Sequence, residues 1–191
     1  MKGYLEVNGH IITRKGALNA YWSDGLLIIA NPSEVLAHED EVKIIIRGDN
    51  VKVTDQAYTK ILSRSNVKIY TEVIGDEVDF LPHPVIFYDG SNAYIENIIR
   101  VEKRARVLEG FILGRGGHGE VFNQGNVKAV TKIYFKDKLI IYDIFKNSKF
   151  VKNALLTYYE VNADGEYDYE KFLVNHNTID SLWRKYSNIN F

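Results

Sequence analysis

The chain has 191 residues, of which 46% are hydrophobic and 26% are charged, and its formal net charge is −1. These are the proportions of a folded globular protein, and a chain of this length can bury about 70% of its unfolded surface. The near-zero net charge argues against nucleic acid as a partner and against a polybasic membrane anchor in the chain. The chain has no cysteine, so disulfides, thiolate metal sites and cysteine nucleophiles are excluded.

No apolar run approaches the roughly 20 residues that span a bilayer, and the first residues lack the apolar stretch of a secretory signal. We therefore expect a cytoplasmic protein. The length is typical of one domain, and no repeat, low-complexity stretch or linker interrupts it, so residues 1–191 are expected to form a single domain.

Apolar and polar residues alternate along most of the chain, which indicates strands with one buried face. The alternation is clear over residues 42–46 and 67–73, whereas residues 23–41 are the least regular part. The longest expected strands are 94–101, 105–113, 127–135 and 139–145, with residues 136–138 as a hairpin connection. Because no helical crossovers separate these strands, we expect an all-β fold with mainly antiparallel pairing.

A helix is expected only near the end of the chain. Asn177 can cap a helix over residues 178–186, and Asp180 would lie near its positive end. Ile179, Leu182, Trp183 and Tyr186 would form one apolar stripe. Such a stripe would either pack on the sheet or dock a partner. The preceding residues, 168–175, are ambiguous between helix and strand.

Motifs of the common enzyme classes are missing from the sequence. The glycine-dense stretch 114–120 lacks the Lys-Ser/Thr of a phosphate-binding loop, and no serine lies in a Gly-x-Ser-x-Gly turn. None of the five histidines has the spacing of a helical metal pair; they are His10, His38, His83, His118 and His176. In Leu81-Pro82-His83-Pro84 the two prolines remove ladder donors, so this segment indicates an edge, a crossover or a corner.

Three segments in order resemble one family. Residues 79–87 are similar to a Leu-Pro-Asp-Pro-(apolar)-Ile-Pro-Phe stretch, with His83 in place of the usual Asp. Residues 109–122 are similar to a Glu-x-x-x-x-Gly-Arg-x-Ala-x-Gly-Glu-x-Phe segment, and residues 40–61 to an upstream strand followed by Thr-Thr-Gln-Ala-x-Thr-Lys. These patterns resemble urease accessory protein D, also called H.

The resemblance implies a layered, β-helix-like all-β fold with a small C-terminal helical part and no catalytic activity. Members of that family bind apo-urease and accessory protein F, which recruits the GTPase G. Together these proteins deliver nickel to urease. A water-filled passage through the protein is the proposed nickel route, so transient nickel is expected and no permanently bound cofactor.

By motif match, Asp40 and Glu120 are expected to line that route, with His83 and His118 as further metal candidates. Gly114, Arg115 and Gly119 are expected to shape a tight loop, and the Glu120 carboxylate could instead bond loop amides. Two rivals stay open. One is a β-sandwich enzyme or carbohydrate-binding module with an aromatic cleft, and the other is an adaptor with no ion contact.

Overall fold

A computed structural model describes residues 2–31, 34–114, 119–147 and 153–189. The described residues form fifteen strands in one sheet and a single helix, α1 (His176–Ser187). The strands are β1 (Lys2–Asn8), β2 (Ile11–Lys15), β3 (Asn19–Ser23), β4 (Leu26–Ala30), β5 (Val35–Leu36), β6 (Glu41–Arg47), β7 (Asn50–Asp55), β8 (Lys60–Ile61), β9 (Asn66–Phe80), β10 (Val85–Phe87), β11 (Asn92–Leu113), β12 (Asn126–Phe135), β13 (Lys138–Lys146), β14 (Ala154–Val161) and β15 (Tyr167–Val174). The all-β class with a C-terminal helical part is confirmed.

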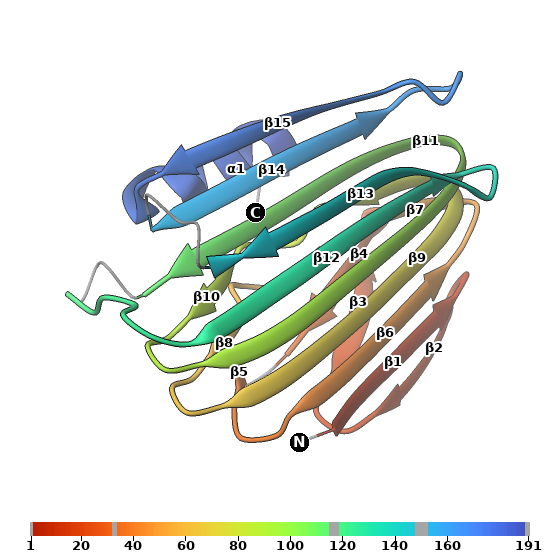
Figure 1. Cartoon of the computed structure of the whole chain (residues 1–191). Helices are drawn as coiled ribbons and strands as arrows, with labels where there is room; N and C mark the ends of the chain where they lie inside the picture. The colour runs from red at the N-terminus through yellow and green to blue at the C-terminus, as the bar shows by residue number, and fades with distance from the viewer. Residues whose placement is uncertain (1, 32–33, 115–118, 148–152, 190–191) are drawn as a thin grey trace.

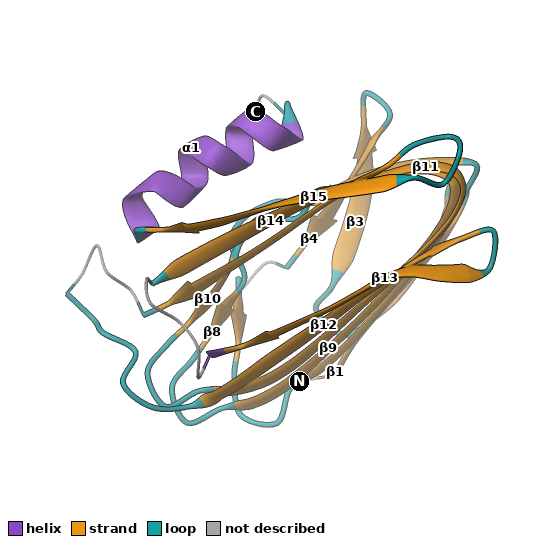
Figure 2. Cartoon of the chain, turned by 45° about the horizontal axis from the view of Figure 1, so that its top comes forward, coloured by secondary structure: helices purple, strands orange, loops and turns teal. Residues whose placement is uncertain are grey.

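The sheet is curled into a half-barrel with two facing layers (Figures 1 and 2). The long strands β9 and β11 belong to both layers. Their first halves pair with β6 and β12, and their second halves pair with β7 and β14. The register of β9 and β11 shifts between Val101 and Arg104, where the sheet turns over.

Gly75 lies at this turn and has no room for a side chain. A Cβ atom there would be 2.6 Å from the carbonyl oxygen of Gly48. Where two backbones approach this closely, only glycine fits without displacing one of them. The two expected strands 94–101 and 105–113 are thus one bent strand, because a turn in the sheet separates them rather than a loop.

The sheet is mixed rather than mainly antiparallel, which corrects the expected pairing. Nine of the fourteen pairings among the described strands are parallel. Parallel neighbours need a long connection, usually a helix. Here the connection is a strand of the other layer. The chain crosses to the second layer and then returns to pair beside the strand from which it started. The β-helix-like layering implied by the resemblance explains this pattern.

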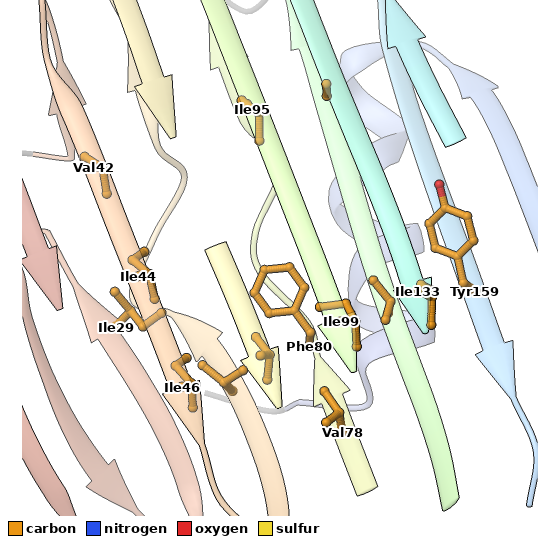
Figure 3. Close-up of a cluster of buried hydrophobic side chains, with 14 of the residues drawn as sticks. Ile29, Val42, Ile44, Ile46, Val78, Phe80, Ile95, Ile99, Ile133 and Tyr159 are labelled. Atoms are coloured by element: carbon orange, nitrogen blue, oxygen red, sulfur yellow. The ribbon is translucent and has the colours of Figure 1, made fainter. Parts of the chain in front are cut away.

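The hydrophobic core fills the space between the two layers. Figure 3 shows Val42, Ile44 and Ile95 from one layer and Phe80 from the other with their side chains in the same interior space. Leu5, Val53, Ile99 and Ile133 are fully buried there. The expected alternation of residues 42–46 therefore does bury one face of that strand, and the expected strand 127–135 also turns one face inward.

Helix α1 packs on the outside of the second layer. Its buried residues Ile179 and Trp183 contact Leu108 and Leu156 of the sheet in a second, smaller core. The stripe expected from the sequence thus packs on the sheet. The helix begins two residues earlier than expected, with Asn175 rather than Asn177 at the N-cap.

Two remaining expectations concern short segments. The ambiguous residues 168–175 are mostly strand β15, and the hairpin at residues 136–138 is confirmed between β12 and β13. In the described part of the chain, no helix has the length and apolar character needed to cross a membrane. The single-domain extent 1–191 stays a prediction.

Candidate functional site

A buried carboxylate lies in the core between the layers. Glu109 belongs to the second half of β11 and is only 6% exposed. Its Oε1 accepts hydrogen bonds from Asn97 Nδ2 at 3.1 Å and from Thr131 Oγ1 at 2.6 Å. The period-two pattern turns all three side chains inward, from β11 and β12. These polar groups are bonded to one another in an otherwise apolar core.

The polar cluster continues from Glu109 to the open side of the half-barrel. The hydroxyl of Tyr159 lies 3.4 Å from Glu109 Oε2 and donates to Asp143 Oδ2 at 2.6 Å. Lys171 Nζ, on edge strand β15, pairs with the same Asp143 oxygen at 2.6 Å. A chain of polar contacts therefore runs from the core to the opening between β13 and β15.

Burial sets the charge of this cluster. It raises the pKa of Glu109 to about 7, although hydrogen bonds from Thr131 and Asn97 act in the opposite direction. Burial would also raise the pKa of Asp143, but hydrogen bonds from Lys171 and Tyr159 outweigh it and hold that pKa below its ordinary value. Burial, Glu109 and Asp143 together raise the pKa of Tyr159, which stays a neutral donor. Near neutral pH, Glu109 can hold or release a proton while Asp143 is charged.

Two cavities lie on either side of this cluster. One of about 110 Å³, room for several waters, lies between the layers, and its lining includes Asn97, Glu109, Asp55 and His83. The second, of about 320 Å³, lies at the open side; its lining residues are Ile140, Ile141, Tyr142, Asp143, Tyr159, Tyr167, Tyr169 and Lys171. Glu109 and Tyr159 lie between the two spaces.

The Leu-Pro-His-Pro segment contributes Pro82 and His83 to the lining of the first cavity. It crosses from β9 to β10, and the ring Nδ1 and the backbone N–H of His83 both lie 2.7 Å from Asp55 Oδ1. The His83 ring stacks on Trp183 of α1 with centroids 3.9 Å apart, and Trp183 Nε1 donates to the Pro82 carbonyl. Burial raises the pKa of Asp55, although its hydrogen bonds with His83 act against that. Of the three expected possibilities the segment is the crossover, and its Pro82 carbonyl helps to fix the helix to the sheet.

The motif-based metal candidates do not come together around one point. Asp40 Oδ2 accepts the Ala37 amide in a turn before β6, and Glu120 Oε1 accepts the Asp89 amide at 3.4 Å in a loop. Neither residue lines either cavity, whereas His83 lines the first. Within the described ranges, no group of three or more His, Asp and Glu side chains is placed to hold a metal ion.

The glycine loop is described only in part. Gly114 has φ +81°, and a Cβ there would lie 2.7 Å from the Glu120 carbonyl oxygen, so the chain returns closely on itself. Gly119 also has a positive φ, +73°, which suits a glycine in a tight loop. Arg115 and His118 lie outside the described residues.

Among the matched motifs Glu109 is only the first residue of segment 109–122, with no site role expected, and none of the motifs contains Asn97 or Thr131. A signal was present, because each is a polar residue at an inward position of an alternating strand. Thr71 and Asp143 occupy similar inward positions on β9 and β13. Which of these side chains meet depends on how the two layers face each other, and the pattern of a single strand does not contain that information.

These features define a β-rich scaffold with a polar path through a layered core. The model of the UreD urease accessory protein family matches residues 20–155, more than two thirds of the chain. The chain therefore belongs to this family, whose members serve urease maturation as accessory proteins and are not catalysts. A search of the curated proteins found no match.

Proposed function

We propose that this protein acts in the cytoplasm as a maturation scaffold that binds apo-urease and accessory protein F, through which the GTPase G is recruited. In this proposal nickel is a cargo that passes between the two sheet layers on its way to urease. Family membership supports the accessory role, and the buried polar cluster supports the passage.

The position of Glu109 between two cavities is the observation that carries the passage. Its Oε1 end faces Asn97 and Thr131, and its Oε2 end faces Tyr159, which contacts Asp143 at the opening. A carboxylate in an apolar core is costly unless it is bonded, so a core that needed only packing would favour an apolar residue there. The cluster supports a route with polar groups at short intervals.

The ligand types along this path suit transit rather than storage. Carboxylate, amide and hydroxyl oxygens bind divalent ions such as nickel more weakly than thiolates or clustered imidazoles. A conduit needs sites that admit an ion and also release it. On this proposal the ion meets Asp55, His83 and Glu109 in the first cavity and Asp143 in the second. Asp40, Glu120 and His118 stay predictions as route residues.

The rival binding-module interpretation rests on the second cavity. Tyr142, Tyr167 and Tyr169 surround its opening with Asp143 nearby, which is the aromatic cleft that a carbohydrate-binding module would use. The family match favours the accessory role. The experiment below also separates the two, because a carbohydrate site would leave nickel incorporation unaffected by changes in the core.

The test is urease activation in cells that express urease, its accessory proteins and a variant of this chain. We expect Glu109→Gln/Asp143→Asn to lower the nickel content and activity of purified urease while the variant still co-purifies with its partners. Glu102→Gln, an exposed change of the same kind, serves as the control and is expected to give normal activation. Normal nickel content in the double variant would exclude the core route.

The purely adaptor interpretation has its own test. If Asp40→Ala/Glu120→Ala and Glu109→Gln/Asp143→Asn both leave nickel incorporation normal, the protein binds partners without contact to the ion. Loss of co-purification in either variant would instead point to a damaged binding surface, so circular dichroism of each purified variant accompanies the assay.

A further inference from the structure

The two strands that border the open side of the half-barrel carry most of the large apolar side chains exposed to solvent. Of the ten such side chains among the described residues, six lie on β13 and β15: Leu139, Tyr142, Ile144, Tyr167, Tyr169 and Leu173. Single exposed apolar residues are ordinary, but a cluster on one side of a molecule indicates an interaction surface.

Both of these strands also have an unpaired backbone edge. Among the described strands, β13 pairs with β12 alone and β15 with β14 alone. Figures 1 and 2 show β15 at the rim of the second layer, with α1 on the outer face of that layer and not along its edge. An open edge of eight residues is long enough for an extended segment to add to the sheet.

The charge of this region indicates what kind of segment would bind. Residues 154–174 contain five acidic residues and one lysine, and that lysine is paired with Asp143; the acidic residues are Glu160, Asp164, Glu166, Asp168 and Glu170. None of the five forms an ion pair within the part of the chain that the structure describes. Their carboxylates bond only neutral groups, such as the hydroxyl of Tyr186 at 2.8 Å from Glu170.

Two of these acidic residues face each other across the hairpin. Glu160 lies directly opposite Asp168 in the β14–β15 register. Like charges at opposed positions destabilise a strand pair. Arg106, the partner of Glu160 on β11, is already bound to Asp79 through Nε at 3.0 Å and through Nη2. The hydrogen bond to Asp79 is the main cause that raises the pKa of Arg106, and the Glu160 charge is a lesser one. This arginine therefore offsets part of the repulsion, and a cation from outside would relieve it further.

We propose that edge strand β15 binds an extended, Lys/Arg-rich segment of a partner protein as an added strand. Backbone bonds to the free edge give the affinity. Tyr167 supplies a face for a cationic side chain, whereas the Tyr169 ring already has Lys171 Nζ 5.9 Å from its centroid. The acidic residues select a basic sequence. A second copy of this chain is a poorer occupant of the same edge, because an acidic β15 would repel another β15.

This inference adds a partner surface to the proposed function and needs only that the accessory role involves a partner. It does not depend on nickel passage, so its test uses the full chain alone, without urease. The probe is the synthetic peptide Lys-Val-Arg-Val-Lys-Val-Arg, and the control probe has Glu at every basic position. Binding is measured by fluorescence anisotropy, and the site by amide hydrogen exchange.

We expect the basic peptide to bind, to slow amide exchange in residues 167–173, and to lose affinity as salt rises. Asp168→Lys should weaken binding about fivefold or more, since an exposed ion pair contributes up to about 1 kcal/mol and reversal adds repulsion. Glu102→Lys, the same charge change far along the chain, should have little effect.

Three outcomes would overturn the inference. One is the absence of slowed exchange in β15 at saturating peptide, and another is equal binding of the acidic peptide. The third is dimerisation of the free protein through β15, seen as a doubled mass by light scattering together with protection of residues 167–173 without peptide. None of these results bears on the nickel test above.

Discussion

Glu109 shows how strongly a single residue depends on its surroundings. On an exposed strand it would be an ordinary charged side chain, but between the layers its pKa is about 7. Its hydrogen bonds with Asn97 and Thr131 do not offset the loss of water fully. The same burial that makes it a candidate for ion contact makes its ionised form unfavourable for folding.

Glu109 should therefore make the protein less stable as pH rises. Its folded pKa is above the unfolded value of 4.5, so its contribution is full below that value and is lost as pH passes through about 7. The loss is at most about 3 kcal/mol. We expect Glu109→Gln to flatten the fall in unfolding free energy between pH 5 and pH 8, measured by urea denaturation. An unchanged slope relative to the native protein would contradict the burial of this carboxyl.

Gly110 is the neighbouring residue and is restricted by space rather than charge. A Cβ at this position would lie 2.7 Å from Cγ and 2.8 Å from Cβ of Pro84. The crossover segment therefore lies directly on the β11 backbone, which keeps His83 in the lining of the first cavity.

We expect Gly110→Ala to lower the unfolding free energy by about 1–3 kcal/mol, the usual effect of overpacking. In a Pro84→Gly background the same substitution should have a smaller effect, because its main clash is removed. The measurement is a double-mutant cycle by chemical denaturation. Additive effects of the two changes would show that Pro84 is not what excludes a side chain at position 110.

At the scale of elements, helix α1 is attached by a few specific contacts. Trp183 is fully buried, stacks on His83 and donates to the Pro82 carbonyl. Tyr58 adds a hydrogen bond to Asp180 at 3.0 Å, and burial raises the pKa of that tyrosine. The apolar stripe sets which face of the helix is buried, and the crossover segment sets where the helix lies.

Trp183→Ala should destabilise the protein by about 3–5 kcal/mol, as removal of a buried aromatic side chain does. Amide exchange in α1 should accelerate more than exchange in β6, because the helix loses its anchor while the first layer keeps its core. Tyr186→Phe, which removes only an exposed hydroxyl bond to Glu170, is the control and should change stability little. A loss below about 1 kcal/mol for Trp183→Ala would contradict the anchoring role.

At the scale of the whole molecule, the half-barrel is continuous on one side and open on the other. The bent strands β9 and β11 join the layers through the backbone. On the open side, the pair of Lys171 with Asp143 and the bond from Tyr159 to Asp143 connect β13 with β14 and β15. The side that we propose as a partner surface is thus also the side where side-chain contacts, and not the backbone, join the two layers.

Lys171→Ala should loosen the open side without unfolding the protein. The ion pair is partly exposed, so its removal should cost only about 1 kcal/mol of stability. Amide exchange should accelerate in β13 and β15 and stay unchanged in β6 and β9. Lys103→Ala breaks an exposed pair with Asp76 at the bend, and it should leave exchange on the open side as it was. Equal exchange in both variants would show that Lys171 does not hold the two layers together.

The sequence by itself determined the strand class, the hairpin at residues 136–138, the helical stripe around Trp183 and, through three motifs, the family. These features are local, since alternation, turn residues and short motifs act within a few residues of one another. The mixed pairing of the sheet and the meeting of Glu109 with Asn97, Thr131 and Tyr159 came only from the tertiary structure. Those contacts join residues on different strands, and a strand's own pattern says which side chains turn inward but not which inward side chains they meet.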